Sequence, residues 1–276
     1  MAQHPTPERH IRRFDAFNRG LHLALMTSFL GLAATGLPLL FSSAPWAGRL
    51  SRLFGGFEAA GVFHRLFAVV MITTFVLHVG RLVHRVVIGR EAILWGPASM
   101  VPQPRDLQEF LAHVRWFVGR GPRPAFDHFT YWEKFDYWAV FWGMAIIGGS
   151  GFMLWFPTAM GSFLPGWVFN VATLIHGEEA FLAAVFLFTV HFFNNHFRPD
   201  KFPQDTTMFT GRVPLEIYKH EHRREYERLL ASGELEKYLV DAPSAPQAQS
   251  ASLLGATLIT IGLTLLTLVI LGFLGI

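Results

Sequence analysis

Six histidines of this chain lie on long apolar stretches, where an ionisable side chain is costly and is usually kept for function. The whole sequence of 276 residues contains thirteen histidines and no cysteine. Without a thiol the chain can form no disulfide, no cysteine-ligated iron–sulfur cluster and no thioether-bound haem. Any metal or redox chemistry must therefore depend on imidazole, and the candidate side chains are His22, His64, His78, His176, His191 and His196.

Two of the apolar stretches carry a pair of histidines on one helix face. The spacing is 14 residues from His64 to His78 and 15 from His176 to His191, which leaves each pair about 40–60° apart around an ideal helix and about 21–22 Å apart along it. These two helices run in the same direction, so His64 matches His176 in depth and His78 matches His191. Facing imidazoles are the axial ligands of a b-type haem, and two stacked b haems would carry electrons across a membrane.

His22 complicates the assignment of the inner haem, because it lies at the inner start of the first stretch, at the same depth as His78. His196 lies about 140° around the helix from His191 and would serve only a third haem. The spacing leaves three assignments open: His22 ligates the inner haem, His78 ligates it, or both ligate and a third haem is present. Zinc is disfavoured because no three ligands cluster at one depth.

Five stretches are long and apolar enough to cross about 30 Å of hydrocarbon as helices. The composition agrees, with 51% hydrophobic and 16% charged residues. We therefore predict an all-α integral membrane protein. Its expected parts are a cytoplasmic N-terminal segment (1–20), a four-helix transmembrane bundle (21–197), a cytoplasmic amphipathic segment and linker (198–250) and a C-terminal transmembrane helix (251–276). The apolar stretches themselves are 21–41, 62–79, 138–156, 168–193 and 253–276.

Lysine and arginine are distributed unevenly between the two sides that these helices define. Twenty of them lie in three segments that are expected to be cytoplasmic, residues 1–20, 81–134 and 198–237. The first outer loop holds two, Arg49 and Arg52. The excess predicts a multi-pass protein of the bacterial inner membrane, with the N terminus in the cytoplasm and the C terminus in the periplasm. The net charge of +3 therefore needs no nucleic-acid partner, and membrane lipid is the expected surroundings.

Four sequence blocks resemble the membrane cytochrome b family, which includes the gamma subunit of formate dehydrogenase, the cytochrome b of nickel–iron hydrogenases and thiosulfate reductase cytochrome b. The resemblance covers about residues 10–230 and implies four helices that hold two b haems. It pairs His64 with His176 and His22 with His191, whereas His78 departs from the formate dehydrogenase pattern. The blocks are NRGLH at 18–22, FHR at 63–65, LIH at 174–176 and TVHFFNNHFRP at 189–199.

The resemblance also implies partners. The family exchanges electrons between a quinone pool, of menaquinone or ubiquinone, and a partner subunit, which would make this chain the electron-transfer subunit of a quinone-linked oxidoreductase. The segment 132–199, with KFDYW and GFMLWFP, resembles cytochromes b found beside multihaem c-type cytochromes. Because the chain lacks cysteine, an iron–sulfur or multihaem c-type subunit is the expected partner. Two alternatives are an electron conduit and anchor without a quinone site, and a haem-free transporter with a histidine relay.

A few charged residues near the histidines are further candidates. Arg65 follows His64 at the outer surface and could pair with a haem propionate, or only reach the interface. Glu178, Glu179 and Asp136 could take protons from quinol, although each also suits an ordinary polar helix start. Three glycines on the third stretch would let a haem or another helix approach closely; they are Gly148, Gly149 and Gly151.

Overall fold

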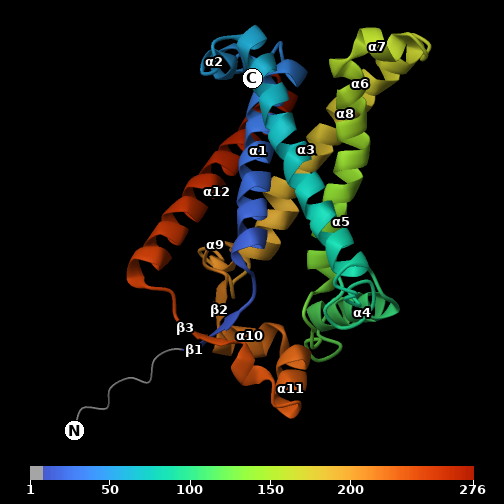
Figure 1. The fold of residues 1–276 in the computed structure, drawn as a ribbon. Helices are drawn as coiled ribbons and strands as arrows, with labels where there is room; N and C mark the ends of the chain where they lie inside the picture. Colours follow the sequence, from blue (N-terminus) through green and yellow to red (C-terminus); the bar gives the residue numbers. More distant parts are fainter. Residues whose placement is uncertain (1–8) are drawn as a thin grey trace. The chain divides into compact units, whose positions relative to one another are not determined.

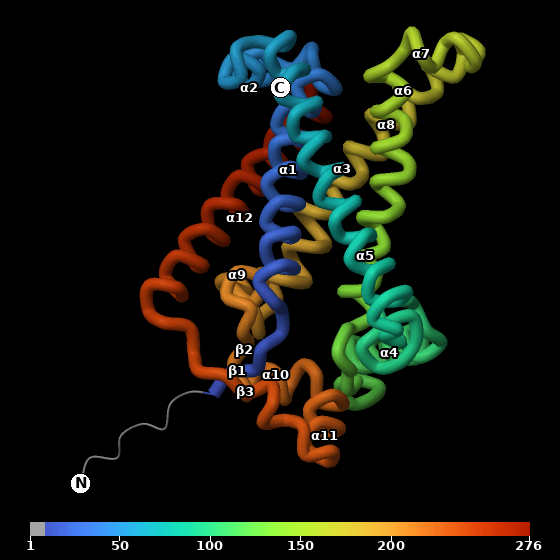
Figure 2. The backbone as a smooth tube through the Cα atoms, viewed as in Figure 1, coloured from blue at the N-terminus to red at the C-terminus, as the bar shows by residue number. Residues whose placement is uncertain are grey.

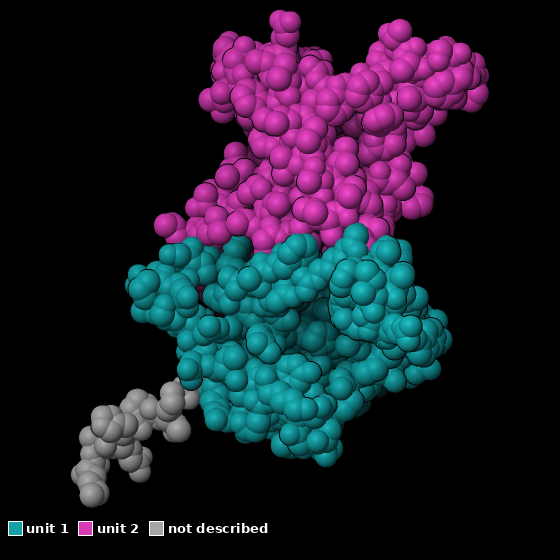
Figure 3. Space-filling model, in the orientation of Figure 1, with its two compact units in different colours: residues 1–19, 80–138, 206–252 teal, residues 20–79, 139–205, 253–276 magenta. Residues whose placement is uncertain are grey.

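A computed structural model describes residues 9–276 of the chain, so the first eight residues of the expected N-terminal segment lie outside the description. The chain divides into two compact units, coloured separately in Figure 3. Unit 1 consists of residues 1–19, 80–138 and 206–252, and unit 2 of residues 20–79, 139–205 and 253–276.

Five helical segments are long and apolar enough to cross a membrane, as predicted. The long helices are labelled in Figure 1. Each contains nearly all of one predicted stretch and extends it into polar flanking residues. The segments are α1 (Ala16–Leu40), α3 (Phe57–Val87), Tyr131–Trp155, Trp167–Phe197 and α12 (Ala245–Leu274). Short helices α2 (Ala47–Arg52) and α7 (Pro157–Gly161) lie in the connections of unit 2.

Two of the five segments change helix type along their length. Tyr131–Trp155 comprises α5 (Tyr131–Gly143), the π-helical turn η1 (Met144–Gly148) and α6 (Gly149–Trp155). Trp167–Phe197 comprises α8 (Trp167–Phe186) and the π-helical turns η2 (Leu187–His191) and η3 (Phe193–Phe197), and the tube in Figure 2 follows it as one path. A π-helical turn has more residues per turn than an α-helix. The angle predicted between His176 and His191, which assumed an ideal α-helix, does not hold here.

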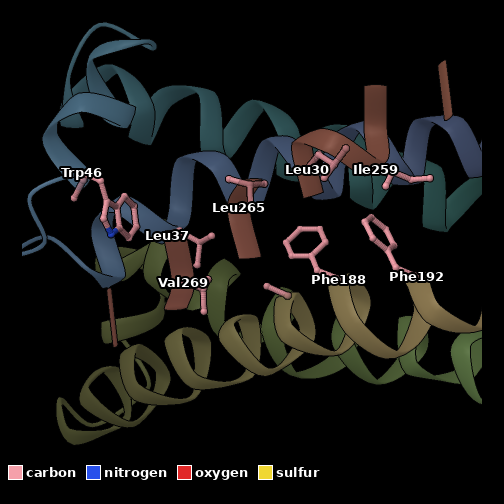
Figure 4. Close-up of a cluster of buried hydrophobic side chains, with 10 residues drawn as sticks. Leu30, Leu37, Trp46, Phe188, Phe192, Ile259, Leu265 and Val269 are labelled. Carbon is pink, nitrogen blue, oxygen red and sulfur yellow. The ribbon is translucent and has the colours of Figure 1, made fainter. Parts of the chain in front are cut away.

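The core of unit 2 joins α1, the α8–η2 segment and α12. Phe188 and Phe192 point from the α8–η2 segment toward Leu30 of α1 and Ile259 of α12 (Figure 4). A methyl group at Gly262 would lie 2.6 Å from the Phe192 ring, so the missing side chain lets α12 pack closely there. The C-terminal helix therefore packs within unit 2, as well as being long enough to act as an anchor.

The start of α12 differs from the sequence prediction, which placed residues up to 250 in a segment and linker before the last transmembrane helix. The helix already begins at Ala245. The backbone N–H of Ser244 donates to Oε1 of Gln247 at 3.2 Å, which is half of the Ser-x-x-Gln capping box that starts a helix. Pro246, in the first turn, also suits a helix start because its fixed φ is helical.

Unit 1 contains a three-stranded antiparallel sheet that the all-α prediction did not include. Strand β1 (Arg9–Arg12) lies between β2 (Arg212–Pro214) and β3 (Leu239–Asp241). Ile11 pairs with Val213 on one side and with Leu239 on the other. Its side chain is buried against Val213 and Tyr218. The prediction of an all-α fold is otherwise confirmed.

The remaining helices of unit 1 are short. They are α4 (Pro104–Phe117), α9 (Thr207–Thr210), α10 (Leu215–Glu221), α11 (Arg223–Ala231) and the 3-10 turn η4 (Leu235–Lys237). The sequence predicts a cytoplasmic amphipathic segment within residues 198–250, and in the structure Tyr218 and Leu229 of that segment are buried by unit 1 itself.

A buried group of charges ties these short elements together. Arg13 contacts Glu225 at 3.5 Å and donates to the backbone oxygen of His128 at 2.8 Å. Glu225 also contacts Nδ1 of His128 at 2.7 Å. His222 donates from Nδ1 to the backbone oxygen of Asp127 at 2.7 Å. Charged groups that are buried in this way are costly unless they are paired with an opposite charge or hydrogen-bonded.

Candidate functional site

His64 of α3 and His176 of α8 lie face to edge in unit 2, as the matched depths predicted. Their ring centroids are 6.2 Å apart and the ring planes make an angle of 75°. Both side chains are half-buried. Two metal–nitrogen bonds of about 2 Å, added to about 1.1 Å from each Nε2 to its ring centroid, separate two opposed imidazole ligands by roughly 6 Å. The observed separation therefore fits one metal ion between the two rings.

The hydrogen bonds of both rings leave Nε2 available as a ligand atom. Thr35 donates its only hydroxyl proton to the carbonyl of Gly31 at 2.7 Å. With the hydroxyl proton on that carbonyl, Thr35 accepts from Nδ1–H of His64, which lies 3.0 Å away. Nδ1 of His176 lies 3.0 Å from the carbonyl oxygen of Ile147, which can only accept. Each neutral ring thus carries its proton on Nδ1, the arrangement in which a second group orients a metal-ligating histidine.

Two glycines make room for these rings on the neighbouring helices. A methyl group at Gly36 of α1 would lie 3.1 Å from Cε1 of His64. A methyl group at Gly151 of α6 would lie 2.8 Å from Cε1 of His176, closer than real Cβ contacts. Each imidazole is therefore seated against bare backbone, which fixes its position.

A second group of histidines consists of His22 at the start of α1 with His191 and His196 of the η2–η3 segment. His22 interacts electrostatically with both of the others. Its Nδ1 is buried, and no residue in the range 9–276 provides it with a hydrogen bond. A buried polar atom without a partner costs free energy, so this nitrogen fits a site in which a bound group completes the contacts.

His78 and His196 have other neighbours. The ring of His78 lies edge-on to Phe141, with centroids 6.3 Å apart. Nδ1 of His196 accepts the backbone N–H of Asp205 at 3.3 Å, so the proton of the neutral ring is on Nε2. Nδ1 of His191 likewise lies 3.2 Å from the amide nitrogen of Asn195, which can only donate, so the tautomer does not distinguish His196 from His191 as a ligand.

Comparison with known proteins gives one relative in three strains. No family model matches the chain. The cytochrome b556(fdo) subunit of formate dehydrogenase from Escherichia coli K12 is 25% identical over 184 residues, which cover 66% of this chain and 77% of that subunit. The subunits of the strains O6:H1 and O157:H7 match to the same extent. This similarity supports a membrane cytochrome b family for the chain. The recognition made from the histidine blocks is thereby confirmed.

The predicted carboxylates of this chain lie in different surroundings. Glu178 of α8 is exposed, whereas Glu179 is partly covered and accepts a hydrogen bond from Nε1 of Trp142 at 3.3 Å. Asp136 belongs to α5 in unit 1 and is partly buried. Glu179 does not bind the Nδ1 atom of His176, since that atom faces Ile147. Arg65 is exposed beside His64, as an interfacial cation would be.

The sequence prediction missed the residues that orient the rings. Thr35 and Gly36 follow each other on α1, within the block ATGLPLLF at 34–41, and this pair is a signal that could have been used. The carbonyl of Ile147 could not have been foreseen, because every residue has one. It lies in the π-helical turn η1, and π-helical turns are frequent at functional sites.

Proposed function

We propose that the chain is a b-type cytochrome subunit of a membrane oxidoreductase, in which two bis-histidine b haems carry electrons from one side of the membrane to the other. His64 and His176 would hold the outer haem, and His22 and His191 the inner one. The observation that carries the proposal is the separation of 6.2 Å between the rings of His64 and His176, with both Nδ1 atoms already bonded to other groups.

His22 is the better supported partner of His191. It interacts electrostatically with His191 and has a buried nitrogen that lacks a partner within the described residues. The resemblance to the formate dehydrogenase subunit favours the same pairing. A third haem on His78 and His196 has less support, because His78 departs from the formate dehydrogenase pattern.

A bound haem supplies a one-electron carrier whose potential depends on its axial ligands, their hydrogen bonds and its burial. The side chains of this protein determine those conditions. Thr35 and the Ile147 carbonyl keep the proton on Nδ1 and make each imidazole a better donor at Nε2. Gly36 and Gly151 seat the rings, and the apolar helices around them limit the access of water.

We propose that the complex exchanges electrons between quinol and a second redox subunit. The name of the relative, a formate dehydrogenase subunit, supports a redox partner, and the lack of cysteine leaves any iron–sulfur or c-type haem centre to that partner. Glu179 and Asp136 are the proposed acceptors of quinol protons. Both are partly buried carboxylates, whereas Glu178 is exposed and less suited.

We further propose the orientation that the charge distribution indicates. The segments that hold twenty lysines and arginines would face the bacterial cytoplasm, and the loops after α1 and α6 would face the periplasm. His64 and His176 would then lie at the periplasmic end. Cysteine introduced into either set of loops, in a chain that has none, tests this orientation by labelling of intact cells.

Haem content of purified variants tests the proposal. The wild-type chain should give about two haems per chain by pyridine haemochrome, and His176→Ala should give about one, because one bis-histidine site is lost. His196→Ala is the matched control on the same helix and should keep both. A wild-type chain without haem, or full haem content in His176→Ala, would show that the proposed ligation is wrong.

A quinol analogue separates a quinone enzyme from a passive conduit. Reduced analogue added to the isolated complex should reduce the haems within the time of turnover. If the haems stay oxidised with the analogue and are reduced only through the partner subunit, the quinone part of the proposal fails while the haem ligation stands.

A further inference from the structure

Helix α4 of unit 1 leaves an apolar face exposed along its whole length. The side chains recur at the i, i+3, i+4, i+7 spacing of one helix face, and those of Leu107 and Phe117 are 62% and 70% exposed. The exposed apolar residues of this face are Leu107, Phe110, Leu111, Val114 and Phe117, continued by Val118. The opposite arrangement, with apolar residues inward, is normal for a helix of a water-soluble domain.

The polar face of α4 points into unit 1. Asp106 forms an ion pair of 2.8 Å with Lys134, and Glu109 one of 2.6 Å with Arg224. His113 is buried and lies 3.1 Å from the hydroxyl of Tyr131. These contacts fix the rotation of the helix about its axis. The apolar face cannot turn inward without breaking buried charge pairs, which is costly.

Two of those contacts attach α4 to the first turn of a membrane span. Tyr131 and Lys134 begin the span Tyr131–Trp155, and Trp138, one turn farther along, donates to the backbone oxygen of Met100 at 2.9 Å. A span of 25 residues is about 37 Å long, whereas the hydrocarbon core is about 30 Å thick. The excess length places the first turn in the headgroup region, so α4 is held at that depth.

The flanking residues suit a lipid surface. Arg115 of α4 is exposed about 80° around the helix from Leu107, and Trp116, the next residue, is exposed too. Arg105 lies on the far side of the helix and pairs with Asp127 at 3.3 Å. Arginine and tryptophan are enriched in amphipathic helices that lie in the interface of anionic membranes.

We propose that α4 is an interfacial helix that lies in the plane of the membrane, with its apolar face in the boundary between headgroups and acyl chains of anionic phospholipid. It thereby holds the connection between the second and third spans on the bilayer surface. The proposal is independent of the haem assignment, since it rests on α4 and its contacts with α5.

Single-cysteine spin labelling of the full chain tests this position, because the natural sequence offers no competing thiol. Leu111→Cys places the label on the apolar face. Gln108→Cys is the matched control, because Gln108 is an exposed polar residue of the same helix that lies outside the apolar face. Both variants are reconstituted in vesicles of phosphatidylcholine and phosphatidylglycerol. Oxygen, which concentrates in lipid, should relax the Leu111→Cys label more than a water-soluble nickel chelate does, and the order should reverse for Gln108→Cys.

Two results would overturn the proposal. Equal accessibility of both labels to the nickel chelate would place the apolar face in water. Protection of the Leu111→Cys label from both reagents would show that protein, a second copy or a partner, covers it. Both labelled side chains are exposed, so folding should be retained, and the far-ultraviolet circular dichroism of each variant must match that of the wild type.

Discussion

Thr35 holds the ring of His64 in one tautomer. The threonine hydroxyl lies 3.0 Å from Nδ1 of His64 and gives its own proton to the Gly31 carbonyl at 2.7 Å. With the hydroxyl proton on Gly31, the proton of the hydrogen bond to His64 comes from the imidazole. As a result, the ring nitrogen on the far side is fixed as a lone-pair donor by a residue of another helix.

Replacement of that threonine should change the outer haem without removing it. In Thr35→Val the acceptor is lost and His64 becomes a weaker electron donor, so the reduction potential of the outer haem should rise. A net hydrogen bond of about 1 kcal/mol corresponds to about 40 mV for one electron. Potentiometric titration measures the shift. Thr35→Ser keeps the hydroxyl and should restore the wild-type value, and an equal shift in both variants would contradict the hydrogen-bonding role.

A methyl group added at Gly151 should displace His176. The new Cβ would lie 2.8 Å from Cε1 and 3.2 Å from Nδ1 of the ring. Gly151→Ala should therefore lose most of the outer haem, measured as pyridine haemochrome per chain. Gly149→Ala is the control, since nothing lies within 4 Å of its added methyl. Equal haem loss in both variants would point to a general effect of helix α6.

The inner pair can be tested by comparing two alanine variants. His22→Ala should lose the inner haem and keep the outer one, because His22 is the proposed partner of His191. His78→Ala should keep both, since the ring of His78 lies against Phe141. Low-temperature absorbance in the α-band region distinguishes the two haems. The reverse outcome would transfer the ligand role to His78, and loss in both variants would indicate a third haem.

Unit 1 should lose stability in acid. Burial and the nearby charge of Arg13 lower the pKa of His222 to about 4 from 6.5. The unfolded chain therefore binds a proton between these values while the folded unit does not. The free energy of opening should be highest above pH 6.5 and decrease by up to about 3 kcal/mol as the pH falls to 4. Hydrogen exchange of residues 212–231, corrected for intrinsic rates, measures this decrease.

His222→Asn provides the control for that pH dependence. Asparagine can still donate to the Asp127 carbonyl but does not titrate, so the decrease between pH 6.5 and 4 should become smaller. Some of the decrease should remain, because burial and the nearby charge of Arg13 also lower the pKa of His128. An unchanged profile would exclude His222 as the titrating group.

The spans could be predicted from the sequence because about 20 apolar residues in a row leave few alternatives to a membrane helix. The sheet of unit 1 could not. Its strands contain four, three and three residues, too few for an alternating pattern, and β1 pairs with strands far along the chain. The beginning of α12 was predictable in principle from Ser244 and Gln247, but the prolines and polar residues around them suggested a linker.

For the site, the sequence identified the ligand candidates and the facing of His64 and His176. The π-helical turns were not foreseen, and they change the angle between His176 and His191. The two groups that form hydrogen bonds with the rings also differ in how far the sequence predicts them. A threonine side chain such as that of Thr35 can be suspected from its place on a span, whereas the Ile147 carbonyl acts through backbone geometry alone.

The central position of β1 also sets the order of biosynthesis. Residues 9–12 leave the ribosome before any of the spans, but Ile11 must pair with Val213 and Leu239, about 200 residues later. Four of the five spans lie between these partners. Strand β1 therefore stays unpaired until those spans have been synthesised, and the sheet can close only after Leu239 of β3 has left the ribosome. Closure of unit 1 thus marks a chain whose first four spans have already been synthesised.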